Sequence, residues 1–139
     1  MIDSHHHLWN YSQEEYGWIP PGSPLAQDQL IAELEKATSA AGVDATVVVQ
    51  ARQTLAESDW LLSLADQSEI IAGVVGWVPL IDPAVENDLS RLAAHPKFKG
   101  VRHVLQACAW GGRAAWGGVR RARAVGRLGS GCSGVAGLR

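Results

Sequence analysis

The chain has 139 residues, of which 47% are hydrophobic and 19% charged, and its formal net charge at pH 7 is −2. These values are those of one ordinary soluble domain, and they exclude a disordered polyelectrolyte. The sequence has no signal or transit peptide and no apolar run of transmembrane length, so we expect a cytoplasmic protein that does not bind membranes.

The charge is divided unevenly along the chain. All 14 Asp and Glu residues and all three Lys residues lie in residues 1–106, which carry a formal net charge of −8. Residues 107–139 contain six Arg and no Asp, Glu or Lys, and also both cysteines. One Cys pair in such a segment is poor evidence for a disulfide framework. The composition therefore divides the chain into residues 1–106 and a tail, residues 107–139.

Three of the five histidines lie within the first nine residues. If Ile2–His7 is a β-strand, His5 and His7 point to one face and His6 to the other. Two imidazoles at i, i+2 form a bidentate site for a divalent metal such as zinc. Asp3 shares their parity and is a weaker candidate, as a ligand or as the partner of a ring N–H. A tag remnant or a chance His run is the alternative, although the Leu-Trp that follows is not linker sequence.

A loop rich in Tyr, Trp, Gly and Pro follows at residues 10–24. Its aromatic side chains either wall a substrate pocket or only cover the end of the sheet. Leu25–Ala41 has apolar residues at helical spacing, and Gly42 is expected to end this helix as a C-terminal cap.

Strands and helices then alternate. We expect strands over Ala45–Gln50, Ile71–Val78 and Gly100–Leu105, starting at intervals of about 27 residues. A capping box at Thr54–Glu57 opens the helix between the first two. Asp82 and Pro83 are expected to open the helix between the last two. Evenly spaced strand–helix units predict an α/β fold with a parallel sheet.

The tail lacks any such pattern. Of its 33 residues, 24 are Gly, Ala, Arg or Trp, without helical or alternating periodicity. We expect it to be irregular, either because a frameshift in a GC-rich gene produced it or because it is a natural, disordered appendage. Arg- and Gly-rich tails that bind nucleic acid usually repeat a motif, and this one does not, so we expect no nucleic-acid partner.

Four segments together carry a resemblance to a known family: Ile2–Trp9, Val47–Ala51, Ile71–Val78 and Lys99–Gln106. In this order they are similar to the amidohydrolase superfamily, specifically the amidohydrolase 2 group of L-fuconolactonase-like hydrolases. The resemblance covers residues 1 to about 106. It implies a (β/α)8 TIM barrel, of which this chain would hold the first four βα units, followed by an irregular tail.

The resemblance also implies an activity, the hydrolysis of a lactone ester bond, and of a sugar lactone in particular, by a water activated at the barrel mouth. His5 and His7 would then hold a divalent metal, expected to be zinc, although some members of the family need no metal. The His and Asp that the family takes from late strands have no counterpart here. The alternative is a truncated, non-catalytic fragment with at most weak metal binding.

Four residues are candidate contacts for a small-molecule substrate, a lactone or a carboxylate-bearing sugar acid: Arg102, His103, Gln50 and Trp9. Arg102 and His103 are consecutive in a strand, so only one of them lines the barrel interior. An interior Arg would bind a carboxylate or lactone oxygen, whereas an exterior one would pair with a surface carboxylate. Open sheet edges in a partial barrel would also favour self-association.

Overall fold

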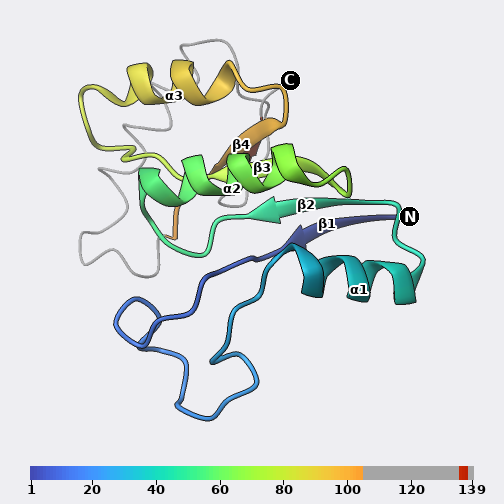
Figure 1. The fold of residues 1–139 in the computed structure, drawn as a ribbon. Coiled ribbons are helices and arrows are strands. Elements are labelled where there is room, and N and C mark those ends of the chain that lie inside the picture. The colour runs from blue at the N-terminus through green and yellow to red at the C-terminus, as the bar shows by residue number, and fades with distance from the viewer. Residues whose placement is uncertain (105–134, 138–139) are drawn as a thin grey trace.

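The computed structural model describes residues 1–104 and 135–137. Four parallel strands form one sheet in chain order, and a fifth strand pairs antiparallel with the fourth (Figure 1). The elements are β1 (Ile2–His6), α1 (Ile31–Ala41), β2 (Ala45–Val49), α2 (Leu55–Gln67), β3 (Ile71–Gly76), α3 (Val85–Ala93), β4 (Phe98–Arg102) and β5 (Val135–Gly137). The alternation of parallel strands and helices confirms the predicted α/β fold of the first part of a TIM barrel.

The two faces of the sheet differ. One face packs against the helices, where Val48, Val74 and Phe98 join Leu61 and Leu89 in a single buried cluster. Each such side chain contributes about 1.5–3 kcal/mol through burial. The opposite face, which we call the inner face, is the one that a closed barrel would enclose. The helices thus hold the sheet from outside and leave the inner face to carry a site.

Helix α1 begins six residues later than its apolar pattern predicted. The backbone of Gln29 pairs with that of Trp9, with N···O distances of 3.0 and 2.9 Å, so the chain before Leu30 belongs to the loop. The Glu33 carboxylate then accepts a hydrogen bond from the Leu30 N–H at 3.1 Å and caps the helix. Gly42 ends it with φ of +65°, as predicted.

The starts of α2 and α3 also differ from the predicted caps. Thr54 Oγ1 accepts a hydrogen bond from the Glu57 N–H at 3.2 Å, as expected, but the Glu57 carboxylate turns away from Thr54 towards the preceding turn. Asp82 accepts a hydrogen bond from Ala84 N–H at 2.7 Å and stabilises a turn before α3 instead of capping it.

Most of the tail lies outside the described residues, so the predictions of an irregular, frameshifted or disordered segment remain predictions. Within the described part, Val135–Gly137 form β5, which pairs with Gly100–Arg102. In the described sheet β1 is the other edge strand, and self-association through an edge also remains a prediction. No helix among the described residues is long and apolar enough to cross a membrane.

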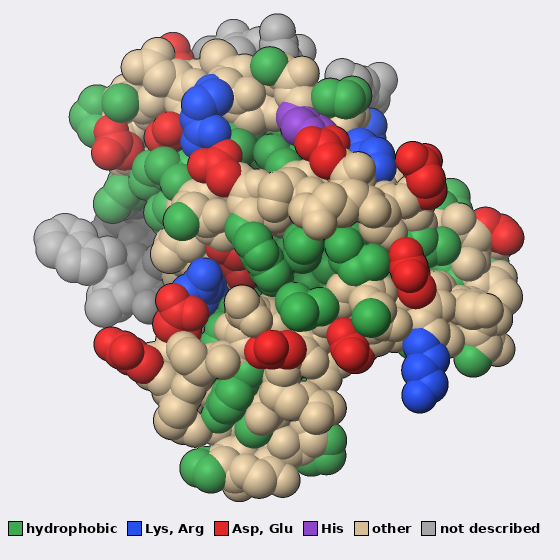
Figure 2. Space-filling model, in the orientation of Figure 1, with side chains coloured by type: hydrophobic (Ala, Val, Ile, Leu, Met, Phe, Trp, Pro, Cys, Tyr) green, Lys and Arg blue, Asp and Glu red, His purple; other side chains and the backbone are tan. Residues whose placement is uncertain are grey.

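The helix-covered surface is more acidic than basic. Figure 2 shows carboxylate side chains spread over this face and a band of apolar side chains crossing its middle. The acidic surplus agrees with the charge of residues 1–106.

Candidate functional site

A bulge in β1 decides where its histidines point. Asp3 is paired with Thr46 and His6 with Val48, so three residues of β1 span two of β2. Thr46 and Val48 are both fully buried on the helix-covered face. Asp3 and His6 therefore share that face, and His5 and His7 lie on the inner face.

His5 and His7 are neighbours on the inner face, with ring centroids 5.1 Å apart and the rings edge to face. His7 Nδ1 lies 2.8 Å from the carbonyl oxygen of Val49. A carbonyl oxygen only accepts, so Nδ1 of neutral His7 carries the proton and Nε2 carries the lone pair. Burial lowers the pKa of His7, which favours this neutral form. The strand thus presents a neutral imidazole with its Nε2 available as a metal ligand or proton acceptor.

Asp3 does not accompany this pair, contrary to the prediction from simple alternation. Its Oδ1 accepts a hydrogen bond from the His5 N–H at 3.0 Å, which turns the chain at the bulge. Strand parity placed Asp3 on the same face as His5 and His7 because it assumed a regular strand. His6 is on the opposite face, as predicted, and burial lowers its pKa. Both His6 ring nitrogens are buried without a hydrogen-bond partner among the described residues.

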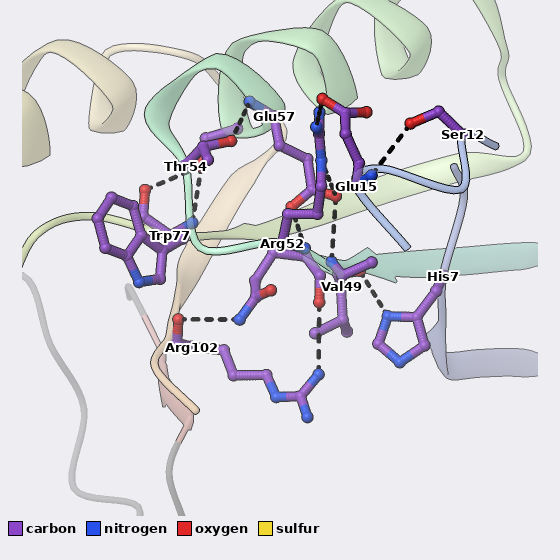
Figure 3. Close-up of polar contacts among 12 residues, drawn as sticks. His7, Ser12, Glu15, Val49, Arg52, Thr54, Glu57, Trp77 and Arg102 are labelled. Atoms are coloured by element: carbon purple, nitrogen blue, oxygen red, sulfur yellow. Dashed lines mark hydrogen bonds and ion pairs between the residues drawn. The ribbon is translucent and has the colours of Figure 1, made fainter. Parts of the chain in front are cut away.

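Arg102 extends along the same side of the strands as His7 (Figure 3). Its Nη1 lies 3.4 Å from the carbonyl oxygen of Gln50, and its positive charge is one cause of the lowered pKa of His7. Gln50 is fully buried, and its Nε2 donates to the Arg102 carbonyl oxygen at 3.3 Å. Gln50 Oε1 is buried without a partner among the residues that the structure describes. Gln50 thus ties the carboxyl ends of β2 and β4 together, and Arg102 is held beside His7.

The other two predicted substrate contacts have protein partners. His103 Nδ1 accepts a hydrogen bond from Trp77 Nε1 at 2.8 Å, and their rings stack with centroids 5.9 Å apart. Burial lowers the pKa of His103. Trp9 donates from its indole N–H to the Leu25 carbonyl oxygen at 3.3 Å and so closes the base of the loop after β1. The structure therefore brings His5, His7, Arg102 and Gln50 together and places Trp9 within the loop.

The sequence did not identify Glu57, a buried carboxylate at the same end of the sheet, as part of the candidate site. The Glu57 side chain is fully buried, and this burial raises its pKa to about 7. Arg52, Glu15 and Tyr16 surround it. The Thr54–Glu57 capping box was the sequence signal, but it pointed to a helix start and gave no hint of burial.

The sequence matches the model of the amidohydrolase family, Amidohydro_2, over residues 2–128. The chain belongs to this amidohydrolase family. The match extends past residue 106, into the segment where no resemblance was expected.

Two curated relatives of the amidohydrolase chain are lactonases. It is 36% identical over 106 residues to an L-fucono-1,5-lactonase of Burkholderia ambifaria, which covers 76% of this chain and 37% of the relative. It is 39% identical, also over 106 residues, to an L-fucono-1,5-lactonase of Burkholderia multivorans. The chain therefore spans little more than a third of the length of these relatives.

Solved amidohydrolase structures have the same fold. A Burkholderia multivorans amidohydrolase with bound HEPES is 35% identical, with a TM-score of 0.80, and the match covers 89% of this chain and 45% of that one. A second structure, described as an amidohydrolase from the same organism with bound zinc, is 39% identical with a TM-score of 0.68. The match covers 78% of this chain and 38% of that structure.

The donor set on the inner face fits part of a metal site. His5 and His7 are adjacent imidazoles, which suit zinc and similar divalent ions. No group of three or more His, Cys, Asp or Glu side chains that could hold a metal occurs among the described residues. Catalytic zinc usually has three protein ligands. The two histidines thus provide an incomplete ligand set within the described part of the amidohydrolase chain.

Proposed function

We propose that the chain carries the first part of the active site of a lactone hydrolase, acting on the ester bond of a sugar lactone. The observation that carries the proposal is the placement of His5, His7 and Arg102 at the carboxyl ends of parallel strands, where TIM-barrel sites lie. The two lactonase relatives support the reaction class. Because the chain spans about a third of their length, its own activity is part of the proposal.

His5 and His7 would hold a divalent metal through their ring nitrogens, and zinc fits because a similar amidohydrolase has been described with zinc bound. A divalent metal at this place supplies Lewis-acid polarisation of a carbonyl and lowers the pKa of a bound water. The contact from His7 Nδ1 to the Val49 carbonyl oxygen fixes the ring and leaves Nε2 for the ligand.

Arg102 would orient the substrate. Its guanidinium is permanently charged and supplies two parallel N–H donors, which match a carboxylate or a lactone ester group. Two hydrogen bonds hold it beside His7: Gln50 Nε2 donates to the Arg102 carbonyl oxygen, and Arg102 Nη1 donates to the Gln50 carbonyl oxygen. The small-molecule partner that this site fits is therefore a lactone or a carboxylate-bearing sugar acid.

One observation favours a second candidate function. The described residues offer no third metal ligand beside His5 and His7. On this alternative the chain is a non-catalytic fragment that binds a divalent metal weakly. The two functions differ in whether the purified chain turns over a lactone.

The test is the hydrolysis of L-fucono-1,5-lactone, followed as acid release, with and without added zinc. We expect the parent chain to exceed the uncatalysed rate, His7→Gln and Arg102→Met to lose about tenfold to a hundredfold, and the control His95→Gln to keep its rate. His95 contacts Asp66 at 3.1 Å on the outer surface, away from the inner face. A parent rate equal to the uncatalysed rate under both conditions would reject the lactonase and favour the fragment.

A further inference from the structure

The turn after β2 and the loop after β1 are joined by one guanidinium. Arg52 lies in that turn, and its Nη1 forms an ion pair with the carboxylate of Glu15 in the loop. The guanidinium carbon of Arg52 also lies 5.7 Å from the centre of the Tyr16 ring, over its face. Arg52 therefore contacts two consecutive residues of the loop, Glu15 through an ion pair and Tyr16 through a cation–π contact.

The turn that carries Arg52 is hydrogen-bonded to the side chain of Glu57. The Glu57 carboxylate accepts hydrogen bonds from the N–H groups of Ala51 at 3.3 Å and Arg52 at 2.7 Å. Arg52 Nε lies 4.0 Å from Glu57 Oε1 and is buried without a hydrogen-bond partner among the described residues. The buried acid thus fixes the backbone of the turn that carries Arg52 and lies next to its guanidinium (Figure 3).

The part of the loop that Arg52 contacts is compact. Tyr16 N–H donates to the Ser12 carbonyl oxygen at 2.9 Å, and Ile19 N–H donates to the Tyr16 carbonyl oxygen at 2.8 Å. Tyr16 and Ile19 are only 2% and 0% exposed. Segment 12–19 is therefore held together by its own backbone hydrogen bonds, and the contacts of Arg52 join it to the turn after β2.

We propose that Arg52, Glu15 and Glu57 form a latch that fixes segment 12–19 at the carboxyl end of β2 and so sets one wall of the substrate pocket. The Glu15 and Arg52 side chains are 47% and 28% exposed, whereas that of Glu57 is 0% exposed. Water competes only for the Glu15 contact, so this contact opens first and the buried half stays in place. The assignment of a pocket to this end of the sheet rests on the proposed function, whereas the latch itself does not.

The test compares loop opening with global stability in two variants and a matched control. Chymotrypsin cleavage after Trp18, which is 70% exposed, reports loop opening, and a urea midpoint reports unfolding. We expect Glu15→Gln to speed this cleavage about three- to tenfold, with the urea midpoint unchanged. Arg52→Lys keeps a cation beside Glu57 but loses the planar fork, and we expect it to act in the same direction. Glu14→Gln removes an exposed acid next to Glu15 and should cleave at the parent rate.

Two outcomes would overturn the latch. One is equal cleavage rates for Glu15→Gln, Arg52→Lys and Glu14→Gln. The other is faster cleavage accompanied by a matching fall of the urea midpoint, which would indicate general destabilisation. Cleavage is measured without substrate, so a chain that fails to hydrolyse lactones and a chain without a latch give separate results.

Discussion

His7 Nδ1 lies 2.8 Å from the Val49 carbonyl oxygen, and this contact joins the carboxyl ends of β1 and β2. It assigns the proton of neutral His7 to Nδ1 and directs Nε2 away from the strand. An imidazole fixed in this way is prepared to bind a metal without losing rotamer entropy. We therefore expect the histidines of the inner face to bind a metal and His6 not to bind one.

Zinc or cobalt titration of single variants measures this difference. We expect His5→Ala and His7→Ala each to weaken binding at least about tenfold, because each removes one of two neighbouring imidazoles. His6→Ala should bind like the parent, since His6 is paired with Val48 on the opposite face. Loss of binding in His6→Ala alone would mean that the face assignment is wrong.

Glu57 should give the protein a distinct dependence of stability on pH. Burial raises its pKa from 4.5 to about 7, so between these values the folded chain holds a proton that the unfolded chain has released. Stability is therefore lost as the pH rises from about 4.5 to 7, by at most about 3 kcal/mol. Glu57→Gln cannot ionise and should lack this loss.

The measurement is the free energy of unfolding in urea at several pH values for Glu57→Gln and the parent. The lowered pKa values of His6, His7 and His103 act in the opposite direction below about 6.5, but they are common to both proteins and cancel in the difference. Asp59→Asn, an exposed acid on the same helix paired with Arg91, is the control. A difference that stays constant from pH 4.5 to 7 would contradict the assignment.

The sequence was sufficient to predict the parallel sheet and the strand ends at which the candidate site lies. The continuous β-branched run Thr46–Val49 and the spacing of the strands predicted the parallel order. The loss of Asp3 from the inner face was not predictable, because a bulge changes parity without any mark in the residue types. Glu57 is fully buried and interacts with Tyr16 from the loop after β1, and a contact between residues so far apart in the sequence leaves no local pattern.

Gly76 marks a close approach of β3 to α2 and β4. A Cβ at this position would lie 2.8 Å from Ser58 Oγ and 3.0 Å from Phe98 Cε2. Ser58 Oγ is fixed because it donates to the Trp77 carbonyl oxygen at 2.9 Å and accepts from its N–H at 2.7 Å. We expect Gly76→Ala to lower the free energy of unfolding by about 1–3 kcal/mol.

Gly73→Ala is the matched control for this change. A Cβ there would also meet an atom at 2.8 Å, but that atom is Cγ of Lys99, whose exposed side chain can move aside. Urea denaturation of both variants should therefore give a clearly smaller loss for Gly73→Ala. Equal losses would show that the close contact with Ser58 does not determine how much Gly76→Ala lowers the free energy of unfolding.

Lys97 stabilises the end of α2 from outside the helix. Helix α2 has no basic residue in its last turn, and Lys97 Nζ donates to the carbonyl oxygens of Ala65 at 2.5 Å and Ser68 at 3.2 Å. A cation at a helix C-terminus satisfies orphan carbonyls and interacts favourably with the helix dipole. We expect Lys97→Met to cost about 1 kcal/mol of unfolding free energy, because Met keeps the aliphatic stem and removes only the charge and donors. Lys99 Nζ donates to the exposed carbonyl oxygen of Pro96 at 2.7 Å, so Lys99→Met should change stability much less in the same urea measurement. If the two Met variants unfold at the same urea concentration, the contact to α2 contributes nothing beyond a surface charge.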